Sequence, residues 1–304
     1  MNNQLAVTIG NMSLEHTVFN GAGWCKDLEH VEELARSASS AVVLGSITKL
    51  PRTGNIGNVH RQLPQFSLNA LGMPNKGVAY YESILNEMAD ACQEKGKPLI
   101  VSIAGFDPQE FFELAAMVLN TRASMVELNF GCPNVWNSGE QKPIFAFQPN
   151  GIEKVLELIS GEFPLNRVMT KMSPYSNPLA LQEIAAVINE YADLAAVVTT
   201  NTFPNGFAMD GKGRPLIEKM EFGGISGPPM LPIGLGQVKQ FRKALSDRIA
   251  IIGVGGISTG QHVIDYLRAG ANAVQVTSAL FLETPAVFNR ILIEYTDILA
   301  EKEL

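Results

Sequence analysis

Short apolar runs, rich in β-branched residues, alternate along the chain with longer stretches in which apolar residues recur every three or four positions. Eight such runs lie at 17–20, 41–45, 98–104, 125–129, 167–171, 195–200, 249–256 and 273–279. Most are followed by a helical pattern, such as DLEHVEELARSA at 27–38 and PQEFFELAAMVLNT at 108–121. Continuous apolar strands that each lead into a helix indicate a parallel sheet buried on both faces.

Eight strand–helix units in a chain of 304 residues predict an α/β fold, a (β/α)8 TIM barrel with room to spare. LAVTIG at 5–10 and SLEHTV at 13–18 can pair as an N-terminal β-hairpin, and long insertions follow strand 2 (46–97) and strand 6 (202–226). No repeat or linker interrupts the pattern, so a single domain over 1–304 is expected. A doubly wound dinucleotide fold is the alternative, but Ser258 stands where GxGxxG requires its last glycine.

Composition excludes several classes of function and leaves the predicted fold unchanged. The formal net charge is -7 and no basic block appears, which argues against nucleic acid and anionic membranes as partners. The three cysteines form no CxxC pair, and the four histidines have no metal-ligand spacing, so neither a disulfide framework nor a metal site is expected. With no apolar window long enough to span a membrane, the sequence predicts a soluble, cytoplasmic protein.

Polar side chains gather where the predicted strands end, which is where barrels of this class place their catalytic groups. Ser46 follows the second strand, Asn129 and Cys132 follow the fourth, Lys171 ends the fifth and Asn201 follows the sixth. Amides and hydroxyls at strand ends suit a planar ligand with carbonyl and N–H edges, because each edge needs a partner once it leaves water. Cys132 is a candidate proton acceptor, and the polar segment after it, 135–143, is expected to be a mobile loop.

A glycine cluster follows the seventh strand. Gly255 and Gly256 stand there, and Thr277 and Ser278 follow the eighth strand. Backbone N–H groups freed by glycines, beside hydroxyls, are typical of the phosphate site that barrels place after strands 7 and 8. Simple turn glycines are the alternative. The position in the strand count favours a cofactor with a phosphate tail.

Taken together, six motifs and the strand-end lysine Lys171 resemble the dihydroorotate dehydrogenases, over about residues 19–290. The motifs are PRTGN at 51–55, LNALGMPNKG at 68–77, NFGCPN at 129–134, TTNTFPNG at 199–206, FGGISG at 222–227 and IIGVGGISTGQ at 251–261. The resemblance implies an FMN-containing oxidoreductase, a flavoprotein that oxidises dihydroorotate to orotate in pyrimidine biosynthesis.

Two features of the resemblance indicate class 1: the candidate base is a cysteine where class 2 enzymes have serine, and no membrane-binding extension is expected. The segment NGAGWCKDLEHVEEL at 20–34 is most similar to class 1A, whose members are homodimers that use fumarate as electron acceptor. Class 1B relatives need a second subunit with an iron–sulfur cluster and FAD, and nothing in the sequence excludes such a partner.

The resemblance also implies roles for individual residues. Cys132 would remove the C5 proton of dihydroorotate while the C6 hydride passes to N5 of FMN. The residues expected to bind substrate are Asn69, Leu71, Gly72, Met73, Asn129, Asn134, Asn201 and Thr202. Those expected to bind FMN are Ala22, Gly23, Ser46, Asn129, Lys171, Gly227, Gly255, Gly256, Thr277 and Ser278.

One departure from the family pattern concerns a lysine at the end of the second strand that reaches both flavin and substrate. Alignment without gaps puts Gly45 at this position, and Lys49 follows four residues later. Either Lys49 or another group compensates, or the enzyme is a paralogue that acts on another cyclic amide or enone. A flavin-binding protein without catalysis is the third alternative.

Overall fold

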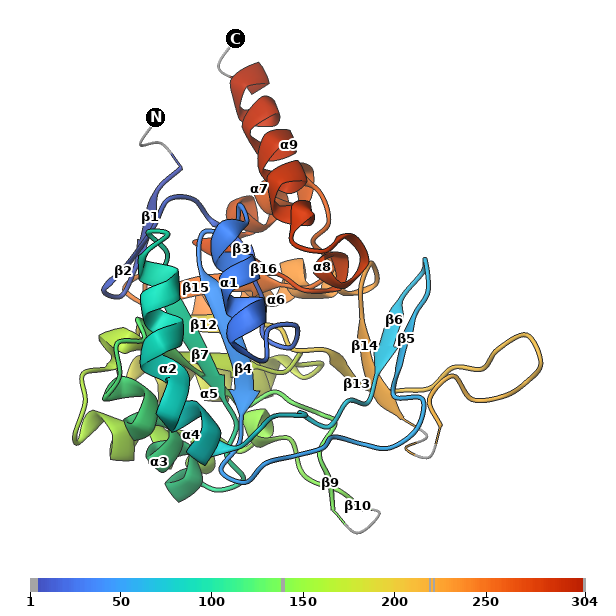
Figure 1. Cartoon of the computed structure of the whole chain (residues 1–304), viewed down its shortest axis with the longest axis horizontal. Helices are drawn as coiled ribbons and strands as arrows, with labels where there is room; N and C mark the ends of the chain where they lie inside the picture. The colour runs from blue at the N-terminus through green and yellow to red at the C-terminus, as the bar shows by residue number, and fades with distance from the viewer. Residues whose placement is uncertain (1–4, 138–139, 219, 221, 303–304) are drawn as a thin grey trace.

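The computed structural model describes residues 5–137, 140–218, 220 and 222–302. Its central element is an eight-stranded parallel sheet in the order β3-β16-β15-β12-β11-β8-β7-β4, with helices between successive strands (Figure 1). The strands are β3 (Val18–Asn20), β4 (Val42–Ile47), β7 (Leu99–Ile103), β8 (Met125–Asn129), β11 (Val168–Met172), β12 (Ala196–Thr199), β15 (Ala250–Val254) and β16 (Ala273–Val276). Each lies within or overlaps one predicted run, so the predicted barrel is confirmed.

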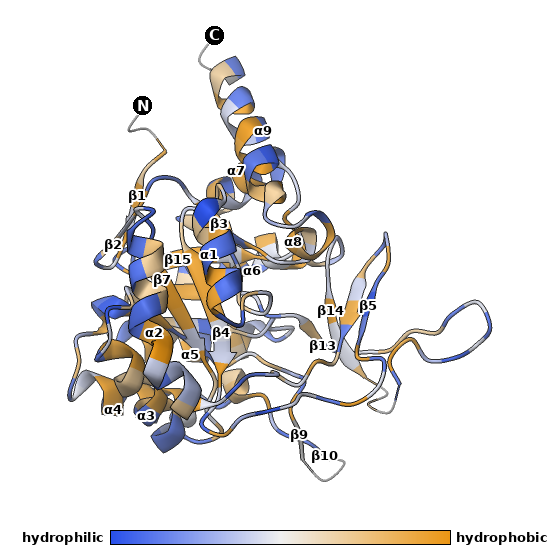
Figure 2. Cartoon of the chain, in the orientation of Figure 1, coloured by the Kyte–Doolittle hydropathy of each residue, from blue (hydrophilic) through white to orange (hydrophobic). Residues whose placement is uncertain are grey.

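Amphipathic helices cover the outside of this sheet. They are α1 (Leu28–Arg36), α2 (Val78–Gln93), α3 (Pro108–Leu119), α4 (Pro149–Ser160), α5 (Pro178–Asn189), α6 (Met230–Ala244), α7 (Gly260–Ala269), α8 (Ser278–Glu283) and α9 (Ala286–Lys302), with short 3-10 turns at Phe145–Phe147 and Leu165–Arg167. Asp27 and Asp107 cap α1 and α3 by accepting backbone N–H bonds, as expected for helix N-termini. In Figure 2 the inner strands are mostly hydrophobic, whereas the helices carry residues of both kinds. None of the described helices is long and apolar enough to cross a membrane.

A side chain closes the barrel between its first two strands. The Asn20 amide donates to the Val43 carbonyl and accepts from the Val43 N–H, both at 2.8 Å. These two bonds take the place of a strand ladder between β3 and β4. Asn20, a polar residue at a strand end, therefore has a structural role.

The N-terminal hairpin pairs β1 (Val7–Ile9) with β2 (Met12–Leu14), as predicted, although β2 is shorter than expected and Val18 belongs to the barrel. Ile9, Met12 and Leu14 are buried in one apolar cluster with inward residues of the barrel such as Phe19. The hairpin thus fills the N-terminal end of the barrel with apolar side chains. The opposite end of the barrel, at the carboxyl ends of the strands, is the one that carries the polar residues of the predicted site.

The two insertions meet at that opposite end. Strands β5 (His60–Gln62) and β6 (Ser67–Asn69) from one insertion and β13 (Phe203–Gly206) and β14 (Gly223–Ser226) from the other form an antiparallel sheet, in the order β13-β14-β6-β5 (Figure 1). A second short pair, β9 (Trp136–Asn137) and β10 (Glu140–Gln141), lies in the segment after β8. That segment was expected to be mobile, which stays a prediction. Its residues 138–139 are outside the described part.

Candidate active site

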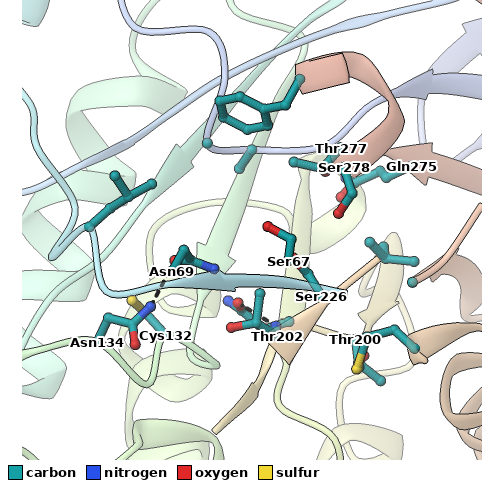
Figure 3. Close-up of a pocket in the computed structure, with 18 of the residues that line it drawn as sticks. Ser67, Asn69, Cys132, Asn134, Thr200, Thr202, Ser226, Gln275, Thr277 and Ser278 are labelled. Atoms are coloured by element: carbon teal, nitrogen blue, oxygen red, sulfur yellow. Dashed lines mark hydrogen bonds between the residues drawn. The ribbon is translucent and has the colours of Figure 1, made fainter. Parts of the chain in front are cut away.

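A cavity lies at the carboxyl ends of the barrel strands, beside the sheet that the insertions form. Its space, including the open mouth, is about 1160 Å³. Every residue that the sequence predicted for substrate or FMN lines it: Ala22, Gly23, Ser46, Asn69, Leu71, Gly72, Met73, Asn129, Cys132, Asn134, Lys171, Asn201, Thr202, Gly227, Gly255, Gly256, Thr277 and Ser278. In Figure 3, Asn69, Cys132 and Asn134 gather together, apart from Gln275, Thr277 and Ser278.

A chain of amides and hydroxyls crosses the cavity between strand ends. The Asn201 amide donates to Asn129 Oδ1 at 3.0 Å, and Asn129 Nδ2 donates to Ser46 Oγ at 2.8 Å. Ser46 in turn lies 2.9 Å from Ser102 Oγ, and the Thr202 N–H donates to Asn201 Oδ1 at 2.8 Å. These bonds fix which edge of each amide points into the cavity, which prepares the site for a ligand of matching polarity.

A second amide pair joins the segment after β8 to the insertion sheet. Asn134 Nδ2 donates to Asn69 Oδ1 at 2.9 Å, and Asn69 Nδ2 donates to the Gly224 carbonyl at 3.3 Å (Figure 3). Cys132 lies in the same segment as Asn134 and lines the same cavity. The proposed base is therefore positioned together with two asparagines that the sequence assigned to the substrate.

The segment 71–73 borders the cavity through its backbone. Gly72 and Met73 have positive φ values of 73° and 56°. Arg52 Nε donates to the Gly72 carbonyl at 3.0 Å, and the Asn55 N–H donates to the Leu71 carbonyl at 3.0 Å. Neither Arg52 nor Asn55 lines the cavity, so the Leu71 and Gly72 carbonyl groups form their hydrogen bonds with residues outside the cavity.

Glycine backbone forms the opposite end of the cavity. Gly227, Gly255 and Gly256 have φ values of 82°, 129° and 70°, a region that favours glycine. A Cβ on Gly256 would lie 2.6 Å from the Leu231 nitrogen, so any other residue would displace the start of α6. The predicted phosphate cradle therefore depends on close backbone approach.

The cavity fits a flat polar group with a phosphate tail, as FMN is. Among the described residues, the buried oxygens Thr200 Oγ1, Thr202 Oγ1 and Gln62 Oε1 line it and have no hydrogen-bond partner in the protein. Such atoms are rare unless a ligand or water satisfies them. Beside Gly23, with φ of 122°, a Cβ would meet no atom within 4 Å, so there is room along that wall.

Lys171 is held inside the barrel by one residue of the adjacent strand β8 and one residue of β16. Its Nζ lies 3.0 Å from Gln275 Oε1 and 3.6 Å from Glu127 Oε1, and Gln275 Nε2 donates to Glu127 Oε2 at 2.8 Å. The Glu127 side chain is fully buried and that of Lys171 is 6% exposed. Each charge is therefore compensated by the other, away from bulk water. Of these three residues, only Lys171 was predicted for the site from the sequence.

A second lysine, Lys26, lines the cavity and was missed from the sequence. Its Nζ donates to the Gly45 carbonyl at 2.7 Å. Burial lowers the pKa of this amine to about 8, and the Cys25 and Cys132 thiols oppose that shift. Lys26 lies six residues beyond the end of β3, within the segment 20–34 that resembles class 1A, but nothing in that segment shows where its side chain points.

Burial raises the pKa of the half-buried Cys132 thiol. The Asn134 N–H and the positive charges of Arg52, Lys26 and Lys171 lower this pKa and offset part of that effect. A buried thiol becomes a useful proton acceptor only where such groups stabilise the thiolate. Cys132 has this environment.

The backbone at position 45, where the family pattern has a lysine, requires glycine. Gly45 has φ of 120°, and a Cβ there would lie 2.4 Å from the Ser102 carbonyl oxygen. Lys49 does not line the cavity: it lies on the surface, with its Nζ 2.7 Å from Glu113 Oε2. Lys49 as the compensating cation is therefore wrong.

Comparison with known proteins identifies the family of the chain. The family model described as dihydroorotate dehydrogenase matches residues 4–299. A curated protein named putative dihydroorotate dehydrogenase A (fumarate), from Streptococcus pyogenes serotype M3, is 32% identical over 301 residues, covering 98% of this chain and 94% of the relative. Dihydroorotate dehydrogenase A (fumarate) of Lactococcus lactis subsp. lactis is 32% identical over 305 residues, covering 98% and 95%.

The fold is also similar to that of a solved structure. The crystal structure of DHODH from Eimeria tenella in complex with ferulenol aligns with a TM-score of 0.82 and 22% sequence identity. The alignment covers 99% of this chain and 86% of that one.

Proposed function

Since this chain belongs to the dihydroorotate dehydrogenase family, we propose that it oxidises dihydroorotate to orotate, with FMN as its cofactor. The observation that carries the proposal is the Cys132 thiol, positioned beside paired asparagine amides in a cavity whose other end is a glycine cradle. The paralogue that acts on another cyclic amide or enone would use the same flavin site but a different ring, and the relatives' names do not favour it.

The amide groups provide recognition of the substrate ring. In this proposal Asn69, Asn129, Asn134 and Asn201, with Thr202, bind the carbonyl and N–H edges of the pyrimidine. The backbone of Leu71, Gly72 and Met73 faces the carboxylate. The hydrogen bonds among the amides keep them oriented before substrate arrives, so little ordering remains to be done on binding.

Cys132 acts as the general base. Its thiolate accepts the proton from C5, the C5–H electron pair forms the C5–C6 double bond, and the hydride leaves C6. FMN, when bound, supplies the two-electron acceptor for that hydride at N5. Nearby positive charge stabilises the thiolate before the reaction, and Cys132 becomes a neutral thiol as the proton arrives.

The remaining lining residues hold the cofactor in this proposal. Gly227, Gly255, Gly256, Thr277 and Ser278 bind the phosphate, while Ala22, Gly23 and Ser46 border the flavin ring beside Asn129. Lys171 faces the pyrimidine end of the flavin, where a cation favours added negative charge. Glu127 and Gln275 determine where that cation stays.

We assign the protein to class 1 on its cysteine base and to class 1A on the names of its relatives. It acts, in this proposal, as a homodimeric cytoplasmic enzyme built from one FMN-binding barrel domain, with fumarate as electron acceptor.

The test is steady-state turnover of the purified holoprotein without oxygen. With dihydroorotate and fumarate, orotate and succinate should form in equal amounts, and NAD+ in place of fumarate should give little product. Turnover with NAD+ but not fumarate would refute the class assignment. A flavin-loaded protein that makes no orotate with any acceptor would refute the function and leave the paralogue as the better reading.

A further inference from the structure

Two cationic side chains of lysine or arginine line the cavity among the described residues, and their surroundings differ. Lys171 faces the carboxylate of Glu127 at 3.6 Å, so its charge is compensated within the protein. The Nζ of Lys26 donates to the uncharged Gly45 carbonyl at 2.7 Å. An ammonium has three donors, and this bond uses one of them. Lys26 is thus the cation better able to serve an anionic ligand.

The backbone around Lys26 is fixed from two sides. The Gly45 N–H donates to the Cys25 carbonyl at 3.1 Å, and the Gly45 carbonyl accepts from the Gly23 N–H at 3.0 Å. Tyr81 Oη donates to the Lys26 carbonyl at 2.8 Å. The segment after β3 is therefore anchored to the end of β4 and to α2, which limits where the lysine side chain can reach.

Gly45 makes this arrangement possible. Its backbone approaches Ser102 so closely that a Cβ would lie 2.4 Å from the Ser102 oxygen. A cation at the end of β4 cannot be carried by residue 45 itself in this conformation. The Lys26 side chain, from the neighbouring β3–α1 segment, instead places its ammonium at the end of β4, where it donates to the Gly45 carbonyl.

We propose that Lys26 is the substrate-binding cation of this enzyme, which pairs with the carboxylate of dihydroorotate and of orotate. The inference rests on the proposed function, because it takes the ligand from there. The neighbouring cavity wall supplies Cys132, whose thiol and the Lys26 ammonium each shift the pKa of the other group. Lys26 and Cys132 line the same cavity, so one ligand can meet the cation and the proposed base together.

The test compares two ligands that differ only in charge, in the FMN-loaded protein. Orotate and its uncharged methyl ester are titrated against the oxidised holoenzyme, and binding is followed by the flavin absorbance change. Lys26→Met should weaken orotate binding by about tenfold or more, the range of a charge-assisted hydrogen bond, and ester binding by less than about threefold. Lys49→Met, which removes a surface lysine paired with Glu113, should leave both affinities unchanged.

Equal weakening of acid and ester, or no weakening of either, would overturn the role of Lys26. FMN content and thermal unfolding of each variant are measured first. If Lys26→Met does not retain FMN, the same two titrations are made on Lys26→Gln, whose amide can still donate to Gly45 but carries no charge. A wild-type protein that binds neither ligand would instead refute the proposed function, so the two failures are distinguishable.

Discussion

Replacing Glu127 by glutamine should destabilise the protein by about 3–5 kcal/mol, because it leaves the Lys171 charge buried without its counter-charge. The two groups are 3.6 Å apart, with the carboxylate side chain fully buried. At an effective dielectric constant of about 20, two unit charges at this distance attract by about 4–5 kcal/mol. Glutamine keeps the size and the polar contact to Gln275, so the change removes little besides charge.

The assay is urea unfolding of the flavin-free protein, followed by circular dichroism at pH 7. With a slope of about 3 kcal/mol/M for a chain of this size, the midpoint should fall by about 1–1.7 M. Glu157→Gln is the matched control. It breaks an exposed pair whose Lys154 Nζ lies 2.8 Å from Glu157 Oε2, and such pairs contribute less than about 1 kcal/mol.

The double variant Glu127→Gln with Lys171→Met should regain much of the loss, since it removes both charges. A midpoint within about 0.3 M of wild type in Glu127→Gln would refute the reasoning, because Lys171 would then have no need of this carboxylate.

Three further predictions concern the base and the glycine at the end of β4. Cys132→Ala should slow flavin reduction by dihydroorotate by about 10²- to 10⁴-fold while FMN stays bound. The control Cys92→Ala, which changes a buried core cysteine, should alter the rate less than about twofold. Equal rates in Cys132→Ala and wild type would exclude Cys132 as the base. Because only the thiolate accepts a proton and burial raises the Cys132 pKa, the reduction rate should rise with pH, and Lys26→Met should move this rise to higher pH by removing a charge that lowers that pKa; a shift to lower pH would contradict this. Gly45→Ala should cost well over the about 1–3 kcal/mol of positive-φ strain alone, because its Cβ also meets the Ser102 oxygen. Gly96→Ala is the control: Gly96 has φ of 70° and no atom lies within 4 Å of the added Cβ, so this variant should lose only the free energy of backbone strain. Equal urea midpoints for the two variants would rule out the close contact at Gly45.

The order of the barrel could be predicted from the sequence because each strand is a local apolar run that precedes a local helical pattern. The same logic brought the predicted site residues together, since all parallel strands end at one face. Ser46, Asn129 and Asn201 come from different strands, yet they form one hydrogen-bonded chain.

What the sequence could not predict are contacts between inward-pointing side chains of strands that are far apart along the chain. Glu127 sits in the run MVELN, where it is one polar residue in an apolar strand, and its partners are 44 and 148 residues further on. Asn20 ends the first predicted strand, and nothing in the sequence indicates that its amide replaces the ladder between β3 and β4. Lys26 was missed because its position depends on the backbone at Gly45, which no motif encodes.

The most direct test of the account is a single reduction of the bound flavin. The purified holoprotein is mixed without oxygen with one equivalent of dihydroorotate, and the flavin spectrum and the orotate formed are recorded together. The account predicts that the oxidised flavin bleaches and that orotate appears in equal amount. A flavin that stays oxidised in the presence of dihydroorotate would contradict it.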